Sequence, residues 1–324
     1  MQAVKWIFGG KKQQAVQKSG RVGVYCTSDG IAMAYITEEQ EIPLLKAQAY
    51  QQADSPSKKQ VALSTFVKQQ SLEGLECIYV LQNEEYTLSL VETPNAPPTE
   101  MQNAFKWLAQ EAITTSIDKS VIDYFELPLR RARDSVKMSY ISIMQRAVIP
   151  QVEAILNDSK LILTTINLPE FAIRNLADLQ PSSKKGVILV SLTANGGKLI
   201  IYKAGMILLC RSIDFKAEGS QADIHPESPM LEQVALEIQR SIDYSSNIFR
   251  QTVANTIYLM PTLMNLEHVT PYLKSALGLE VEQFDLSTST LKSEKPLTLL
   301  EQAQCLMAIG AAVKHVNVTL ETEH

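Results

Sequence analysis

The stretch that decides the fold is 187–213, which reads VILVSLTANGGKLIIYKAGMILLCRSI. Its three apolar runs, 187–192, 198–203 and 206–213, are separated by Asn195-Gly196-Gly197 and by Ala204-Gly205. Because asparagine and glycine accept a positive φ at low cost, both breaks predict tight turns. Valine, isoleucine, leucine and tyrosine dominate the runs and favour strands. The stretch therefore predicts a three-stranded antiparallel meander that begins a domain.

A helix over 229–250 follows the meander and has the clearest periodicity in the chain. Its apolar residues recur at helical spacing: Leu231, Val234, Ala235, Ile238, Ile242 and Phe249. We expect Ile238 and Ile242 to be buried and Gln239 to lie on the opposite face. The pattern then predicts a strand at 256–260, a helix at 266–277, a strand at 280–284, a loop at 285–296 and a helix at 299–314.

The first half of the chain begins in the same order. Strands are predicted at 22–26, 31–36 and 42–50, with a turn at Thr27-Ser28-Asp29-Gly30 between the first two. Asp54-Ser55-Pro56 is typical of a helix N-terminus, and strands at 77–81 and 86–91 come after that helix. The repeated order, meander then helix then strand, predicts an internal duplication.

An extra piece at about 95–165 interrupts the first half and has no counterpart in the second. It opens at Pro94-Asn95-Ala96-Pro97-Pro98 with a helix from residue 99, and strands are predicted at 121–127 and 136–143. We therefore divide the chain into a flexible segment (1–20), a first lobe (21–185) that contains this subdomain, a second lobe (186–296), and a C-terminal helix and tail (297–324) that pack back on the first lobe.

Composition narrows the class of protein. The chain has 324 residues, of which 45% are hydrophobic and 20% charged, with a net charge of −5, which argues against a general nucleic-acid binder. We expect no membrane-spanning segment and no secretion signal. The four cysteines match no zinc or redox spacing, so they indicate buried thiols in a cytosolic protein. The four histidines are scattered, and we expect no metal site.

The N-terminal segment carries one apolar patch, Trp6-Ile7-Phe8, flanked by Lys5, Lys11 and Lys12. Such a patch suits contact with a membrane surface. The other interpretation, which the sequence favours, is a frayed terminus that has no role. Both interpretations stay open from the sequence.

A three-stranded meander that leads into alternating helices and strands, present twice, is the ground plan of the actin, Hsp70 and sugar-kinase superfamily. The stretch 187–213, with Arg211 near its end, resembles the second phosphate-loop meander of the PilM family of type IV pilus assembly proteins. The stretches 234–244, 166–176 and 307–311 resemble the segments around it in the same family. The stretch 122–134, IDYFELPLRRARD, and the glycine-poor 256–264 resemble the MshI branch of the mannose-sensitive (MSHA) pilus system.

This resemblance implies an α/β, actin-like duplicated fold of the FtsA and PilM type, with two lobes and a subdomain inserted in the first. It also implies a cytoplasmic protein, peripheral at the inner membrane. Its partner would be a PilN- or MshJ-like inner-membrane assembly protein, bound through that protein's N-terminal cytoplasmic peptide. A pilus assembly ATPase is a further implied partner.

A nucleotide site in this superfamily needs two glycine-rich hairpins, an acidic residue in each, and a third glycine turn for the adenosine. This chain departs from the pattern with Tyr25 and Thr27 in the first hairpin and with Ser191 and Thr193 in the second. The stretch 259–263 has no glycine, so Pro261 and Thr262 would crowd a nucleotide. What remains as a degenerate nucleotide cleft is Asp29, Gly30, Asn195, Gly196, Glu237 and Arg240.

Two functions follow from these departures. The first is a scaffold that is not an enzyme, has no catalytic residues and needs no cofactor. The alternative is a PilM-like switch in pilus or type II secretion assembly that binds ATP with Mg²⁺ through Asp29. A sugar kinase needs a catalytic aspartate beside a substrate pocket, which the sequence does not place.

The inserted subdomain offers a surface for the partner peptide. Its candidate residues are Tyr124, Phe125, Met138, Tyr140, Arg130 and Arg131. Strands can present an edge or groove to an extended peptide, although the same residues could fill the core of the subdomain. Because neighbouring strand residues point to opposite faces, Tyr124 and Phe125 cannot both face the same side. The arginine cluster could bind an acidic tail or lipid, or could be a solvated link.

Overall fold

The computed structural model of the chain describes residues 19–112, 116–128, 136–193, 196–215, 228–249 and 254–313. The chain forms two compact units. The first comprises Met1–Glu38, Lys46–Ala172 and Met307–Ala312; the second comprises Glu39–Leu45, Ile173–Leu306 and Val313–His324. The boundary between the units follows Ala172, whereas the sequence placed the end of the first lobe at residue 185.

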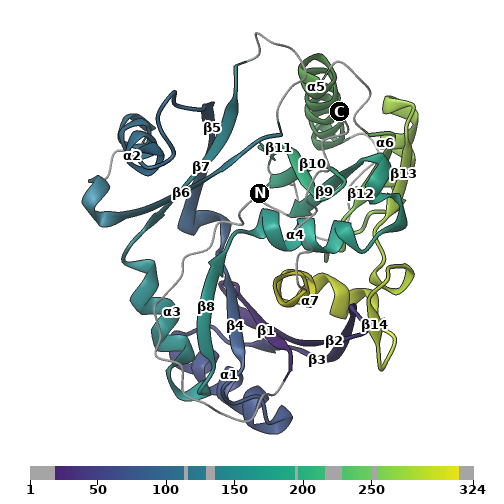
Figure 1. The fold of residues 1–324 in the computed structure, drawn as a ribbon. Helices are drawn as coiled ribbons and strands as arrows, with labels where there is room; N and C mark the ends of the chain where they lie inside the picture. The colour runs from purple at the N-terminus through teal and green to yellow at the C-terminus, as the bar shows by residue number, and fades with distance from the viewer. Residues whose placement is uncertain are drawn as a thin grey trace. The chain divides into compact units, whose positions relative to one another are not determined.

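The sheet of the first unit has the strand order β3-β2-β1-β4-β8. Its strands are β1 (Arg21–Cys26), β2 (Gly30–Glu39), β3 (Ile42–Gln52), β4 (Glu76–Val80) and β8 (Ile162–Asn167). Strand β1 is antiparallel to β2 and parallel to β4, and β8 extends the sheet in parallel beyond β4 (Figure 1). The start of β3, which belongs to the second unit, pairs with β14 (Lys292–Ser293) at Leu44 and Leu45.

Helix α1 (Pro56–Gln70) begins where Asp54-Ser55-Pro56 predicts, with Pro56 at its first position. The Ser55 hydroxyl accepts a hydrogen bond from Lys58 N at 3.4 Å, as an N-cap residue does. Ser71 ends the helix in the left-handed conformation. Helix α3 (Val148–Leu156) packs against α1.

The inserted subdomain is a three-stranded antiparallel sheet of order β5-β7-β6, with α2 (Met101–Ala112) against it (Figure 1). Its strands are β5 (Tyr86–Glu92), β6 (Ser120–Glu126) and β7 (Met138–Gln145). The bounds differ from the predicted 95–165. Strand β5 joins this sheet, whereas α3 and β8 belong to the main body of the first unit. Strand pairing joins residues distant in sequence, so local patterns could not assign these strands to a sheet.

The second unit repeats the topology of the first, with strand order β11-β10-β9-β12-β13. Its elements are β9 (Val187–Thr193), β10 (Gly196–Lys203), β11 (Met206–Ile213), α5 (Pro229–Phe249), β12 (Thr256–Leu259), α6 (Val269–Leu277) and β13 (Glu280–Gln283). Helices α4 (Pro169–Asp178) and α7 (Leu299–Ala312) each contribute residues to both units. Short 3₁₀ turns, η1 to η5, lie at Asn83–Glu85, Ile117–Lys119, Asn157–Ser159, Pro181–Lys185 and Leu286–Thr288.

The turns of the second meander match the prediction in one case and not in the other. Ala204 and Gly205 form the predicted tight turn, with φ of 47° and 85°. The predicted turn at residues 195–197 is shorter, because Gly196 and Gly197 already pair with Thr193 and Leu192 as part of β10. Ala194 and Asn195 lie outside the described residues.

The two meanders share one register, which establishes the duplication. Cys26 pairs with Ile31 in the first hairpin, and Leu192 pairs with Gly197 at the corresponding place in the second. The hairpin tips read Thr27-Ser28-Asp29-Gly30 and Thr193-Ala194-Asn195-Gly196. A glycine with positive φ precedes each first strand, Gly20 at 119° and Gly186 at 95°. The motif Thr-x-Asp/Asn-Gly is a sequence signal of the repeat that the pattern analysis missed.

The core of the second unit joins the meander to α5 and α6. Ile238 is fully buried, as predicted, and Gln239 is exposed. Ile242 packs against the same core, on the predicted face, but is half-buried and not fully enclosed. Ser241 and Ser245 are the fully buried residues in these turns of the helix.

No helix among the described residues is long and apolar enough to cross a membrane. In the same part of the chain, no group of three or more histidine, cysteine, aspartate or glutamate residues could hold a metal ion. All four cysteines are described and buried, and none forms a disulfide. Burial raises the pKa of the Cys26 thiol to about 11, so it is a neutral core group at physiological pH.

Candidate functional site

The tip of the β1–β2 hairpin is closed by its own hydrogen bonds. Thr27 N donates to Gly30 O at 2.9 Å, and Thr27 Oγ1 donates to Asp29 Oδ1 at 2.9 Å. The backbone oxygen of Asp29 accepts from Ala53 N at 2.8 Å. One oxygen of the Asp29 carboxylate therefore serves the turn itself.

The glycines of the first hairpin are required by packing within the first unit. A Cβ atom on Gly23 would lie 1.9 Å from Ala308 O of α7, and one on Gly30 would lie 2.2 Å from Tyr50 Oη. A phosphate cradle needs glycine so that backbone amides can approach the ligand. Here the space beside each glycine holds the chain's own atoms, so these two glycines do not fit that role.

A buried cation, which the sequence analysis missed, contacts this hairpin. Lys59 of α1 is buried, and its Nζ donates to Thr27 O. The carboxylate of Glu85, whose Oε2 accepts from Gln82 N at 2.7 Å, is close enough for the two charges to interact. Burial raises the pKa of Glu85, and the ammonium of Lys59 opposes that rise. The signal was available, since Lys59 shares the apolar helix face of Leu63 and Phe66.

The tip of the β9–β10 hairpin has the same threonine hydroxyl bond, but its glycine is needed for a different reason. Thr193 Oγ1 donates to Gly196 O at 2.9 Å, which matches Thr27 Oγ1 and Gly30 O at 3.3 Å. Gly196 has a φ of 134°, a conformation that side chains rarely adopt. This glycine is therefore required by the backbone. The candidate Asn195 lies outside the described residues.

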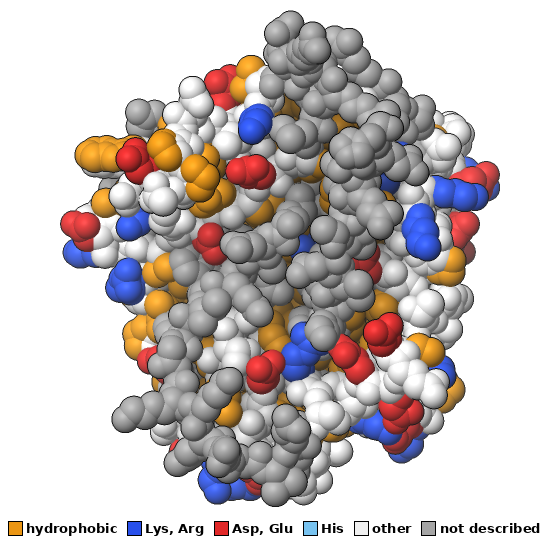
Figure 2. Space-filling view, in the orientation of Figure 1, with side chains coloured by type: hydrophobic (Ala, Val, Ile, Leu, Met, Phe, Trp, Pro, Cys, Tyr) orange, Lys and Arg blue, Asp and Glu red, His pale blue; other side chains and the backbone are white. Residues whose placement is uncertain are grey.

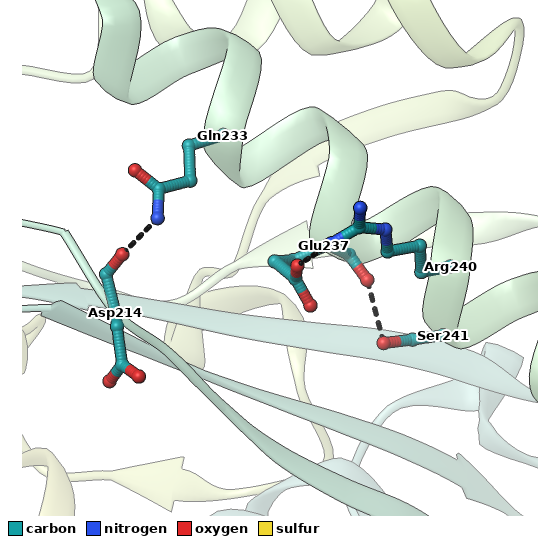
Figure 3. A network of polar contacts seen from close by, with 5 residues as sticks. All are labelled: Asp214, Gln233, Glu237, Arg240 and Ser241. Atoms are coloured by element: carbon teal, nitrogen blue, oxygen red, sulfur yellow. Dashed lines mark hydrogen bonds and ion pairs between the residues drawn. The ribbon is translucent and has the colours of Figure 1, made fainter.

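The candidates Glu237 and Arg240 lie together on the polar side of α5 (Figure 3). Arg240 Nη1 and Glu237 Oε1 form an ion pair at 2.7 Å, while Ser241 Oγ donates to Glu237 O at 2.7 Å. Near the start of the helix, Gln233 Nε2 donates to Asp214 O after β11. The two charges satisfy each other at the surface, and such a pair stabilises a helix by about 0.3–0.5 kcal/mol.

The segment after β12, where the superfamily places its third glycine turn, is held by hydrogen bonds to β9 and within itself. Thr262 Oγ1 donates to Leu192 O at 2.9 Å and accepts from Met264 N at 3.3 Å. A hollow of about 390 Å³ lies here, lined by Leu259, Pro261, Thr262, Met264, Asn265, Leu266, Glu267, Gln283, Phe284 and Leu299. Its charged lining residue among those described is Glu267, which would repel a phosphate. Crowding of a nucleotide by Pro261 stays a prediction.

Considered unit by unit, the described residues do not fit Mg²⁺-ATP. The first hairpin supplies one acid, Asp29, which is engaged by Thr27. Its glycines are packed against α7 and Tyr50, and the hollow after β12 is mostly apolar. We therefore derive no chemical step from a nucleotide.

Two of the partner-binding candidates in the inserted subdomain are core residues. Phe125 and Tyr140 are 3% and 2% exposed, and their rings stack with centroids 5.2 Å apart. Phe171 of α4 packs edge-on to Phe125 at 5.0 Å. Neither Phe125 nor Tyr140 is accessible to a peptide.

The other candidates divide between the surface and the undescribed part. Tyr124 is half-buried and stacks on Phe105 of α2 with centroids 4.0 Å apart, so it faces the opposite side from Phe125, as predicted. Met138 is half-buried, and Arg130 and Arg131 lie outside the described residues. Hydrophobic side chains gather over this subdomain in Figure 2, and Trp107 of α2 is 72% exposed.

The two edges of the inserted sheet differ. On the outer side of β6, Ile122 O accepts from Gln102 Nε2 at 2.9 Å, and Tyr124 N donates to Asp123 Oδ1 at 2.8 Å. Side chains of α2 and β6 therefore occupy hydrogen-bonding groups on that edge. On β5, Thr93 N donates to Lys137 O, which places the backbone groups of Leu88 and Leu90 on the outer side by alternation. Among the described residues none bonds to those outer groups, and in that part of the chain the edge of β5 is therefore unpaired, or open.

One end of β5 is fixed to the main body of the first unit. Tyr86 Oη lies 2.8 and 2.9 Å from the two carboxylate oxygens of the buried Glu170 in α4. Sequence patterns gave no indication of this contact between residues far apart in the chain. It holds the start of the open edge in place.

No family model matches this chain, and no curated protein matches its sequence. Solved structures do. The chain is similar to a chain of a PilM–PilN type IV pilus biogenesis complex, with a TM-score of 0.69 and 16% identity over 91% of this chain and 98% of that one. It is also similar to the cytoplasmic domain of EpsL, an inner membrane component of the type II secretion system of Vibrio cholerae, with a TM-score of 0.50 and 12% identity over 92% and 97%.

A third similar structure, from Bacteroides thetaiotaomicron, is described as a protein with an actin-like ATPase fold and unknown function. Its TM-score is 0.47, with 9% identity over 82% of this chain and 90% of that one. The predicted actin-like duplicated α/β fold is confirmed, and it is of the PilM type. At these identities the likeness establishes the fold alone.

Proposed function

We propose that this protein is a scaffold of type IV pilus biogenesis that binds the N-terminal cytoplasmic peptide of a PilN- or MshJ-like inner-membrane protein. The subdomain inserted in the first unit, with its open β5 edge, carries this proposal. A location in the cytoplasm, peripheral at the inner membrane, belongs to the same proposal. So does service in an MSHA-type system, where a pilus assembly ATPase is a second partner.

The open edge suits an extended peptide. Leu88 and Leu90 present backbone donors and acceptors outward, and a peptide strand can bond to them while alternate side chains enter pockets. Each such bond is worth about 0.5–1.5 kcal/mol. The second unit has no counterpart of this sheet in its described residues, so the contact would be specific to the first unit.

We propose further that the protein is not an enzyme and works without a cofactor. The support is the packing at Gly23 and Gly30 and the engagement of Asp29 by Thr27. The alternative, a nucleotide-binding switch in pilus or type II secretion assembly, needs those positions to rearrange. A Mg²⁺-ATP titration, described below, distinguishes the two.

Peptide binding measured by fluorescence anisotropy tests the docking proposal. The probe is the N-terminal cytoplasmic peptide of the candidate partner, N-methylated at one residue at a time. Because only alternate amides of an added strand face β5, methylation should weaken binding up to about tenfold at every second position and leave the others unchanged. This test leaves the folded protein untouched.

Charge substitutions locate the surface. Thr87→Glu, at an exposed position of β5, and Met138→Glu, opposite Glu92 of β5, should weaken the binding with little change in melting temperature, whereas Leu299→Glu, an exposed position of the second unit, is the matched control. Loss of binding only in variants that also melt early would mean that these residues are core. Normal binding by all three, together with methylation effects that lack a two-residue period, would place the docking surface elsewhere.

A further inference from the structure

The first unit has a groove between α1 and the meander. It has a volume of about 540 Å³ and is lined by Met33 of β2, by Ala49, Gln51 and Gln52 of β3, and by Ser57, Lys58, Val61, Ala62, Thr65, Phe66 and Gln69 of α1. Its floor is apolar, with Met33 and Phe66 buried beneath it. Val61 in its wall is 63% exposed. Between Ser57 and Gln69 the groove runs about 18 Å along the helix, from the rise of 1.5 Å per residue.

In the second unit the corresponding region, between α5 and β11, is closed by side-chain contacts. In the second unit, the guanidinium of Arg211 in β11 lies 5.0 Å from the ring centre of Tyr244 in α5. Gln233 of α5 also bonds to Asp214 O, and Ile213 of β11 is 1% exposed. In the first unit the third strand of the meander carries Ala49 and Gln51 beside the helix instead. The groove therefore comes from small and polar residues on β3, and the shared topology does not require it.

The first described residue, Ser19, lies beside this groove. Tyr35 Oη donates to Ser19 O at 3.1 Å, and Gly20 lies over Tyr35 and Thr37 of β2. Tyr35 and Met33 are two residues apart on one strand, so they share a face and lie about 7 Å from each other. Residue 19, the first described residue, is thus held on the strand face that forms the groove floor.

We propose that the groove between α1 and β3 is the docking site of the chain's own N-terminal segment, with Trp6, Ile7 and Phe8 against its apolar floor. The linker 9–18 would reach about 33 Å if extended and about 15 Å as a helix, lengths comparable to or greater than the groove itself. The patch is the longest apolar run in residues 1–18. Docked there, it covers apolar surface that the second unit covers with its own helix.

The same experiment tests two other binding sites for Trp6, Ile7 and Phe8. Lys5, Lys11 and Lys12 would suit an anionic membrane surface as well. The patch could also enter the groove of a second copy. The observation that favours docking within one chain is the anchoring of Ser19 and Gly20 at Tyr35, which keeps the segment at a high local concentration beside its own groove.

Tryptophan fluorescence reads the position of the patch in the full chain. The chain has two tryptophans, Trp6 and Trp107, so Trp107→Phe leaves Trp6 as the sole emitter. We expect blue-shifted emission that resists acrylamide. Val61→Glu or Thr65→Glu, both at exposed positions of the groove wall, should shift the emission to longer wavelength and raise quenching several-fold. Val136→Glu, an exposed valine in the inserted subdomain, is the matched control and should leave it unchanged.

The outcomes separate the alternatives. Circular dichroism melts establish that the variants are folded, and Thr65→Glu replaces Val61→Glu if the latter melts early. Emission that is water-like before any substitution, or unaffected by both groove variants, overturns the proposal. A blue shift that disappears on dilution assigns the groove to a second copy, and one that appears only with phosphatidylserine vesicles assigns the patch to a membrane; either result overturns docking within the chain.

Discussion

Strands β1 and β9 hold the same place in their sheets, and their hairpins share one register, yet the residues at matching positions have opposite requirements. Gly23 of β1 leaves room for the backbone of α7, where a Cβ would lie 1.9 Å from Ala308 O. Its counterpart in β9 is Leu189, which is 1% exposed and fills space in the second unit. The duplication preserved the backbone pairing, while the side chains followed whatever packs on each sheet.

The helices that cover the two meanders differ in the same way. Helix α5 closes on β11 through Tyr244 and Gln233, whereas α1 leaves a groove beside β3 and places Lys59 against the hairpin carbonyl of Thr27. The difference teaches that a conserved topology in the two halves does not fix their surfaces. Four substitutions or titrations can sharpen or break this comparison.

The largest loss of stability is expected in the second unit, where α5 closes on the meander. Ile238→Ala removes a fully buried side chain from the core of the second unit and should lower the free energy of unfolding by about 2–5 kcal/mol. Urea unfolding measures it. The control is Gln239→Ala on the exposed side of α5, which should cost less than about 0.5 kcal/mol. Equal losses at both positions would mean that the phase of the helix is wrong.

The next effect tests the glycine that distinguishes β1 from β9. Gly23→Ala places a methyl group against the α7 backbone, which cannot move aside as a flexible side chain would. Overpacking of this kind costs about 1–3 kcal/mol, and thermal unfolding should show a clear loss. Gly74→Ala is a contrast, since its methyl group would meet nothing within 4 Å and its cost would come only from the positive φ of 82°, which Gly23 does not have. A neutral Gly23→Ala would contradict the packing explanation.

A smaller effect concerns the hydroxyls that the two hairpin tips share. Thr27→Val and Thr193→Val each remove hydroxyl hydrogen bonds within a turn, and each should cost about 0.5–1.5 kcal/mol. The halves differ in one respect: the hydroxyl of Thr27 also bonds to Asp29. In an Asp29→Ala background the cost of Thr27→Val should therefore shrink, as a double-mutant cycle would measure, whereas that of Thr193→Val should not. Simple additivity at Thr27 would show that Asp29 is not engaged by the turn.

The smallest expected effect is that of nucleotide. Mg²⁺-ATP should leave the melting temperature unchanged and give no heat in a calorimeter, because the glycines of the first hairpin are packed and Asp29 is engaged. A ligand at 100 times its dissociation constant would stabilise the fold by about 2.7 kcal/mol, which is readily visible. A saturable rise in stability would favour the nucleotide-switch alternative.

The sequence predicted most elements because their signals are local. The turn at Ala204-Gly205, the N-cap at Ser55 and the periodicity around Ile238 each depend on residues within a few positions of one another, and the structure confirms all three. The motif Thr-x-Asp/Asn-Gly at Thr27 and Thr193 would have strengthened the duplication further. The candidate site was less predictable: the glycines looked like remnants of a phosphate cradle, and Phe125 and Tyr140 looked available to a peptide.

Only the tertiary structure decided what those residues contact. Gly23 packs against Ala308, Tyr86 bonds to Glu170, and β5 pairs with β7 in a separate sheet. Each partner is distant in sequence. Pairing and packing between distant segments depend on the whole fold, and a local pattern carries no record of them. By itself the sequence determined which segments are strands, turns and helices, since backbone preferences act over a few residues. Packing decides the rest: whether the space beside a glycine is occupied, which sheet edge is open and where a groove remains.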